Sequence, residues 1–211
     1  RKVKLVKKIF FNLFFILCVA CSTNTNNYVD LSSASFGALT GKSKIVQKPA
    51  LIKLGIQPLQ LKEARGYMMA LFNTLIPDLE KTNITYQMAG NDIILTIQSH
   101  IILDDNMNVL DSIKPQLDNM ILTLSKFDRN FIEITGHTSS VGSKNDNLRK
   151  SVNMAQSVAT YFMEKQYKKF RVIPERVFIN GMGESMWIAD NSTREGRLLN
   201  HRIEIRISPL V

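Results

Sequence analysis

The sequence predicts an α+β fold in which helices pack on one face of a mixed sheet. At several places apolar residues alternate with polar ones, which is the pattern of half-buried strands. Between these places apolar residues recur at steps of three and four, which is the pattern of amphipathic helices. Counted from Ile93, the elements follow in the order β-α-β-α-β-β, and this order favours a sheet whose helices gather in one layer.

The first regular elements are expected to be a helix and a β-hairpin. Residues 61–79 carry apolar side chains at mostly helical spacing, which is disturbed near Pro77. Residues 84–97 then alternate on both sides of Gly90 and Asn91, a pair that is typical of a tight hairpin turn.

Two more helices and three more strands complete the prediction. Ser112 is a suitable N-cap for the next helix, and Pro115 is tolerated in its first turn. Another helix is expected to begin near Asn147. The remaining strands are expected at residues 131–134, 177–179 and 202–207.

The first 20 residues have the pattern of a secretory signal peptide. Five Lys or Arg residues precede Ile9–Ala20, an apolar run that is too short to cross a bilayer as a stable helix. Residues 1–20 hold five of the 27 Lys and Arg residues and no acid, so the formal charge of +9 falls to +4 without them. A domain with that balance is not expected to bind nucleic acid.

Cys21 is a candidate lipid-attachment site. Residues 17–22, Leu-Cys-Val-Ala-Cys-Ser, resemble a bacterial lipobox, which implies cleavage before Cys21 and acylation of this cysteine. The alternative is a redox pair of Cys18 and Cys21. Such a pair needs a folded βαβ context, which the flanking residues do not provide.

Residues 21–60 are expected to form a lipidated tether that ends in an extended arm. Residues 22–43 are rich in Ser, Thr, Asn and Gly and show no periodicity. Residues 44–60 are more apolar, but Pro49 and Pro58 disfavour a helix interior or a central strand. This arm is either a linker with incidental apolar residues or a segment that packs on a partner or on a sheet edge.

Four sequence blocks share a pattern of glycines, amides and arginines at fixed spacing. The first two are Gly-His-Thr-Ser-Ser-Val-Gly at 136–142 and Asn-Leu-Arg-Lys-Ser-Val-Asn-Met-Ala at 147–155. The others are Gly-Met-Gly-Glu at 181–184 and Asn-Ser-Thr-Arg-Glu-Gly-Arg-Leu-Leu-Asn-His-Arg-Ile-Glu-Ile at 191–205. By these blocks, residues 90–211 resemble the OmpA-like domain family, which includes the peptidoglycan-associated lipoproteins. Residues 61–89 would then be an N-terminal helix and first hairpin strand ahead of this domain.

The resemblance implies a peptidoglycan-binding domain whose ligand is the diaminopimelate of a stem peptide. In the family an Asp binds the ammonium of this ligand and an Arg binds its carboxylate, but Ser139 and Met154 occupy these positions here. Losing both charge-assisted hydrogen bonds would cost about 3–6 kcal/mol, or roughly a hundred- to ten-thousand-fold in affinity. We interpret Met154 as lying off the apolar stripe of its helix, towards the implied pocket. The candidate peptidoglycan-binding residues are Thr138, Ser139, Asn147, Met154, Arg197 and Arg202.

Some of these residues also have a purely structural interpretation. Asn147 is as suitable for a helix N-cap as for a ligand contact. Arg202 could tie the final strand to a neighbouring loop. His137 and His201 are expected to be hydrogen-bonded side chains rather than metal ligands, and Trp187 is expected on an exposed loop, available to a partner.

These observations favour a non-catalytic outer-membrane lipoprotein whose domain lies in the periplasm and anchors an envelope complex at the cell wall. Ser22 after the lipid-bearing cysteine favours sorting to the outer membrane. A subunit of a secretion system's outer-membrane core, specifically of the type IVB (Dot/Icm-like) class, is the alternative, and it would bind proteins rather than peptidoglycan. An enzyme, a cofactor and a metal are not expected, because the sequence has no recognisable nucleophile, paired-carboxylate or metal motif.

Overall fold

The computed structural model describes residues 44–167 and 170–211 of the chain. The predicted signal peptide, the tether of residues 21–43 and the lipid-attachment site Cys21 lie outside these residues. Within the described ranges, no helix combines the length and the apolar character needed to cross a membrane.

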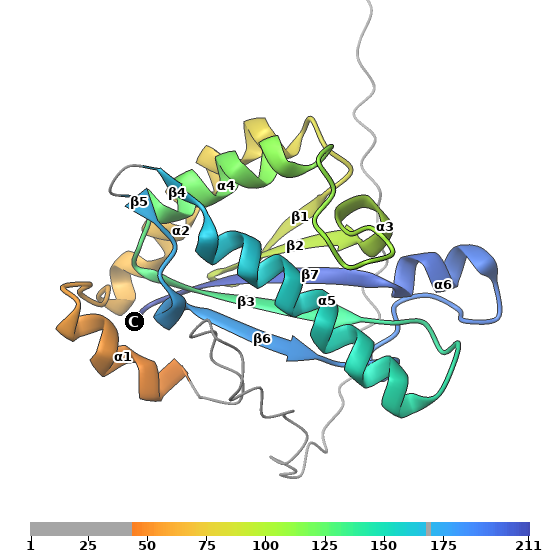
Figure 1. Ribbon diagram of the computed structural model, residues 1–211. Helices are drawn as coiled ribbons and strands as arrows, with labels where there is room; N and C mark the ends of the chain where they lie inside the picture. Colours follow the sequence, from red (N-terminus) through yellow and green to blue (C-terminus); the bar gives the residue numbers. More distant parts are fainter. Residues whose placement is uncertain (1–43, 168–169) are drawn as a thin grey trace, which may run out of the picture.

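A five-stranded mixed sheet forms the centre of the domain (Figure 1). Its strands are β1 (Thr85–Ala89), β2 (Asp92–Gln98), β3 (Asn130–His137), β6 (Val177–Gly181) and β7 (Arg202–Pro209). They lie in the order β1-β2-β7-β3-β6. Strands β3 and β6 run parallel, whereas every other neighbouring pair in this sheet is antiparallel. The predicted mixed sheet is therefore confirmed.

The main helices form one layer over this sheet. They are α2 (Leu61–Leu79), α4 (Lys114–Lys126) and α5 (Lys144–Glu164). Strand β7 shows how the two layers share the core. Its isoleucines, Ile203, Ile205 and Ile207, are fully buried in the main apolar cluster, whereas Glu204 and Arg206 point to the reverse face and stay partly exposed. The predicted order β-α-β-α-β-β and its helical layer are confirmed.

The hairpin of β1 and β2 has the predicted turn. Ala89 pairs with Asp92, so Gly90 and Asn91 are the two connecting residues. Gly90 has φ +63°, a backbone conformation that glycine adopts without a steric penalty.

Short elements of two to seven residues interrupt this framework, and the sequence did not predict them. They are α3 (Ser99–Ile102), β4 (Gln166–Tyr167), β5 (Phe170–Arg171), the 3₁₀-helix η1 (Pro174–Arg176) and α6 (Arg194–Asn200). Each is too short to show a hydrophobic period. In α6 the local signal is the cap, since the Thr193 hydroxyl accepts from the backbone N–H of Gly196 at 2.9 Å.

Two predicted helix starts are wrong, one by a single residue and the other by three. The N-cap of helix α4 is Ile113 rather than the predicted Ser112, and Pro115 lies in the first turn as predicted. Helix α5 begins after Ser143, whose hydroxyl accepts from the backbone N–H of Asp146 at 3.1 Å. Asn147 therefore lies inside the first turns of α5 and is not its N-cap.

The predicted extended arm is wrong over most of its length, because residues Lys44–Lys53 form a helix, α1. Leu51 of α1 is fully buried with Phe131, Phe178 and Leu210, on the face of the sheet opposite to the main helices. Pro49 is tolerated inside α1 because tertiary burial outweighs local propensity. The arm thus packs on its own domain, and one short helix lies outside the predicted single layer.

Candidate functional site

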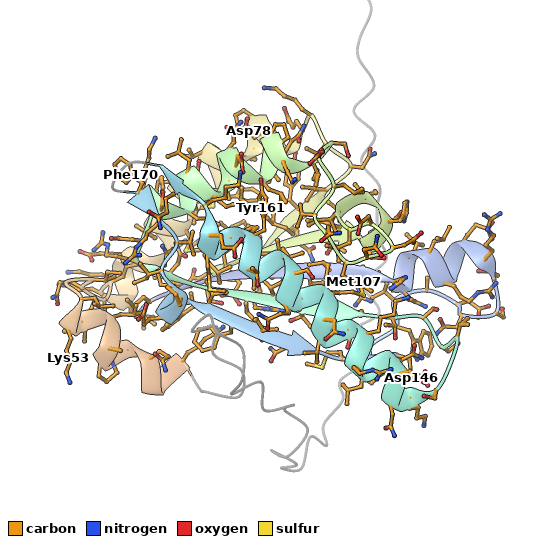
Figure 2. All side chains as sticks on the ribbon, viewed as in Figure 1. Lys53, Asp78, Met107, Asp146, Tyr161 and Phe170 are labelled. Carbon is orange, nitrogen blue, oxygen red and sulfur yellow. The ribbon has the colours of Figure 1, made fainter. Side chains whose placement is uncertain are left out.

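The candidate site lies at the carboxyl ends of the parallel strands β3 and β6. Backbone hydrogen bonds continue past both strands, from Met182 N to Gly136 O at 3.0 Å and from Thr138 N to Gly183 O at 2.8 Å. Figure 1 shows the start of α5 and all of α6 at this end of the sheet. In Figure 2, Asp146 marks the start of α5, and Lys53 marks the end of α1 on the opposite side. The site is thus built by loops and helix ends that the sheet aligns.

Two glycines let α5 lie directly on these strands. A Cβ atom at Gly136 would lie 2.0 Å from the backbone carbonyl oxygen of Ser151, and one at Gly181 would lie 2.4 Å from a methyl group of Val152. The Ser151 hydroxyl also accepts from the backbone N–H of Gly183 at 2.9 Å. The first turns of α5 are therefore fixed against the loop that follows β6.

Asn147 connects α5 to Glu184 in that loop. Its side-chain Nδ2 donates to Glu184 Oε2 at 2.7 Å, while its backbone N–H makes an ordinary helical bond to Ser143. Asn147 is buried, and Glu184 is partly exposed. Sequence reasoning did not include Glu184 among the candidate residues, although it stands in the Gly-Met-Gly-Glu block. Its partner lies 37 residues away, so only the fold shows the pair.

Thr138 and Ser139 begin the loop that follows β3. Thr138 is 3% exposed, and its hydroxyl has no hydrogen-bond partner in the described part of the chain. Because side chains alternate along an extended backbone, Thr138 lies on the same side as Gly136, which faces α5. Ser139 is partly exposed, and the next residue, Ser140, donates its backbone N–H to Asn191 Oδ1 at 3.2 Å.

Arg202 and Arg197 hold the loops of this site in place. The buried Arg202 guanidinium lies 2.7 Å from Glu204 Oε1 and donates to the carbonyl oxygens of Met186, at 3.0 Å, and Asn200, at 3.3 Å. Arg197 donates from Nη1 to the carbonyl oxygens of residues 191 and 192 at 2.9 and 3.0 Å. The structural interpretation of Arg202, as a tie between the last strand and a loop, is confirmed.

Met154 does not lie off the apolar stripe of α5, and this interpretation was wrong. Its side chain is 1% exposed and belongs to the main apolar cluster. More of the circumference of α5 is buried than the sequence pattern predicted, because the helix packs over two strands of the sheet, β3 and β6. Met154 therefore offers almost no surface to a ligand.

His137 is buried on the reverse face of β3 and is neutral at pH 7. Its burial, and secondarily the nearby charge of Arg202, lower its pKa to about 4, although Glu204 acts in the opposite direction. Its Nε2 lies 3.8 Å from Glu204 Oε1, and neither ring nitrogen has a hydrogen-bond partner among the described residues. The expected hydrogen bonding of His137 is therefore absent. Burial likewise lowers the pKa of His201 to about 4.

The polar side chains of the site are hydrogen-bonding groups. Across residues 44–167 and 170–211, no three His, Cys, Asp or Glu side chains gather in a way that could hold a metal ion. The loops carry the carboxylate of Glu184, to which the buried amide of Asn147 donates, and two hydroxyl residues, the buried Thr138 and the partly exposed Ser139. Trp187 is exposed on a loop, as predicted, at 64%.

A β-α-β-α-β-β domain with polar loops at the carboxyl ends of its parallel strands defines the class of this protein. The sequence model of the OmpA family matches residues 103–201. "Probable lipoprotein YiaD" of Escherichia coli (strain K12) is 30% identical over 185 residues, which is 85% of this chain and 80% of that relative. The chain belongs to the OmpA family.

Solved structures agree on the fold. A MotB-like protein from Desulfovibrio vulgaris superposes with a TM-score of 0.55 at 21% identity, covering 70% of this chain and 94% of that one. The cell wall anchor of the T6SS from Pseudomonas aeruginosa gives a TM-score of 0.53 at 22% identity, covering 66% and 96%. At such identities the likeness concerns the fold alone.

Proposed function

We propose that this chain is a non-catalytic outer-membrane lipoprotein that anchors or scaffolds an envelope complex at the cell wall, and that its diaminopimelate binding is weakened. The observation that carries this proposal is the state of the candidate site in the loops after β3 and β6, which we call the loop site. Its hydrogen-bonded framework is intact, whereas the two ionic positions of the family hold the neutral side chains Ser139 and Met154. A site that keeps its hydrogen bonds but lacks the charged Asp and Arg of the family is expected to bind the wall with reduced affinity.

The relatives support this location. The E. coli relative carries the name of a lipoprotein, and one structural neighbour is described as a cell wall anchor. For this chain, the signal peptide of residues 1–20 and the acyl group on Cys21 would supply the outer-membrane attachment. Thr138, Asn147, Arg197 and Arg202 would shape the wall-facing loops, with Arg197 and Arg202 positioning backbone rather than contacting ligand.

Co-sedimentation with purified sacculi tests the proposal. The full-length protein in detergent should be retained at low salt and displaced by an excess of soluble wall fragments. The Ser139→Asp variant should bind about tenfold tighter or more, because it restores one charge-assisted hydrogen bond. Failure of the wild-type protein to sediment with sacculi at low salt would count decisively against wall binding.

A second candidate function is a pure protein–protein interaction subunit of a secretion-system outer-membrane core, for which the type IVB class is our specific proposal. The observation in its favour is a group of exposed apolar side chains on the loop after β6 and on α6, which comprises Met186, Trp187, Ile188, Leu198 and Leu199. Exposed apolar residues with a central Trp are typical of interaction surfaces. Purification of the native lipoprotein from solubilised membranes tests this candidate, and recovery of a lone monomer would contradict it.

A further inference from the structure

We propose that Glu184 binds the primary ammonium group of a wall peptide, and that this binding does not depend on whether the group next to the ammonium is charged. The proposal rests on the proposed function, since it takes the loop site to face the cell wall. It names the chemistry that a site with the neutral residues Ser139 and Met154 would still recognise.

The first step is the state of the Glu184 carboxylate. Asn147 holds Oε2 at 2.7 Å, which fixes the direction of the side chain without supplying a countercharge. Of the ion pairs formed by residues 44–167 and 170–211, none includes Glu184. A partly buried carboxylate that is oriented by a neutral amide favours a cation from outside the chain.

The second, independent step is the buried hydroxyl of Thr138. Its Oγ1 has no partner among the described residues, although the side chain is almost fully buried. The backbone bond from Thr138 N to Gly183 O, at 2.8 Å, places it next to the residue before Glu184. Since its side chain lies on the side that faces α5, where Asn147 is, a ligand N–H that reaches Glu184 would also satisfy this hydroxyl.

The third step concerns the arginines. Arg202 is buried and is bound by Glu204 and two backbone carbonyls. Arg197 donates to two carbonyls of its own loop, and Arg149 pairs with Asp146 at 2.8 Å. Each of these arginines thus already has a structural partner, and Met154 is buried in the apolar core. The ammonium is therefore expected to be recognised equally well beside a carboxylate, beside a carboxamide or on a plain lysine side chain.

The single tryptophan of the chain provides the assay. Trp187 is exposed and lies three residues after Glu184, so we expect its fluorescence to change when a ligand binds at this loop. The probes are stem tripeptides, L-Ala-γ-D-Glu followed by lysine, Nε-acetyl-lysine, diaminopimelate or ε-amidated diaminopimelate. We expect the three peptides with a free side-chain amine to bind within about threefold of one another, and the acetylated peptide at least about tenfold more weakly.

The matched variants are Glu184→Gln and Glu195→Gln. Each removes one acid at this end of the sheet, but Glu195 is exposed on α6 and is not part of the loop site. Glu184→Gln should weaken binding of the lysine peptide about ten- to a hundredfold, whereas Glu195→Gln should leave it unchanged. Thermal unfolding of both variants checks that they fold. The acetylated peptide tests the contact between Glu184 and the ammonium without changing the protein.

Three results would overturn the inference. They are equal binding of free and acetylated amines, unchanged binding by Glu184→Gln, and a diaminopimelate peptide that binds more than tenfold tighter than its amidated form. If any of these occurs while the wild-type protein still sediments with sacculi, the inference fails and the proposed function stands. If the wild-type protein binds neither sacculi nor any peptide, the proposed function itself fails, and the inference with it.

Discussion

Replacing the buried Arg176 with methionine is expected to lower the free energy of unfolding strongly without changing the loop site. The Arg176 guanidinium is fully buried and makes four hydrogen bonds at 2.6–3.0 Å. Its acceptors are carbonyl oxygens of Leu124 and Phe127 at the end of α4, and the carbonyl and side-chain oxygens of Asn130 at the start of β3. Burial lowers the pKa of Arg176 to about 10, so it remains a cation at pH 7.

The magnitude follows from what the substitution leaves behind. Methionine fills much of the same volume, but the carbonyl oxygens lose their donors inside the protein, where each unsatisfied group costs about 1–3 kcal/mol. We therefore expect a loss of about 3–5 kcal/mol, or roughly 6–20 °C in Tm. Arg176→Lys should lose nearly as much free energy of unfolding, because a lysine ammonium cannot reach all the acceptors that the planar guanidinium group binds at once.

Urea and thermal unfolding, followed by circular dichroism, measure the effect. Binding to sacculi, assayed well below the Tm of the variant, should equal that of the wild type, because Arg176 lies at the end of the sheet opposite to the loop site. A loss below about 1 kcal/mol would refute the reasoning. So would a selective loss of wall binding in a variant that unfolds normally.

Three further predictions follow from the described contacts. Leu51→Ala should cost about 2–4 kcal/mol in urea unfolding, because the side chain is fully buried beneath α1; a neutral effect would mean that α1 is not docked in solution. Gly136→Ala should unfold the protein or lower its Tm by more than about 5 °C, since the added Cβ meets the Ser151 carbonyl at 2.0 Å; a well-folded variant with unchanged Tm would refute this close approach. The free energy of unfolding should fall as the pH decreases from about 6.5 to about 4. In that range the unfolded chain binds a proton at His137 that the folded chain excludes, a contribution of about 3 kcal/mol. A His137→Gln variant should show a shallower slope over this range in urea unfolding measured at each pH, and an equal slope would contradict the assignment.

The sequence predicted the sheet and the main helices well because their hydrophobic patterns repeat over enough residues to be recognised. Ile93, Leu95 and Ile97 alternate, and the turn at Gly90 needs a residue that accepts positive φ, so the hairpin could be placed to the residue. Helix α1 was missed because Pro49 argues against a helix locally, and only burial of Leu51 against a distant part of the chain reverses that argument.

The candidate site was only partly accessible to such reasoning. Spacing between sequence blocks could place Thr138 and Asn147 at the same end of the sheet. The width of the buried arc on α5 depends on what covers the helix, so the burial of Met154 could not be predicted from its period. The bond between Asn147 and Glu184 joins residues 37 positions apart, and no local pattern encodes it.

The placement of α1 has a mechanical consequence. A pull on the chain at Lys44 reaches the domain through a ten-residue helix whose contacts include the buried Leu51 and an ion pair from Lys44 to Glu133 at 3.2 Å. Because α1 is not part of the strand pairing of the sheet, we expect it to yield first under tension. Unwinding from 1.5 to about 3.4 Å per residue would lengthen the connection by about 20 Å. Strands β3 and β7, and the loops at their far end, would stay folded while this short helix absorbed the strain.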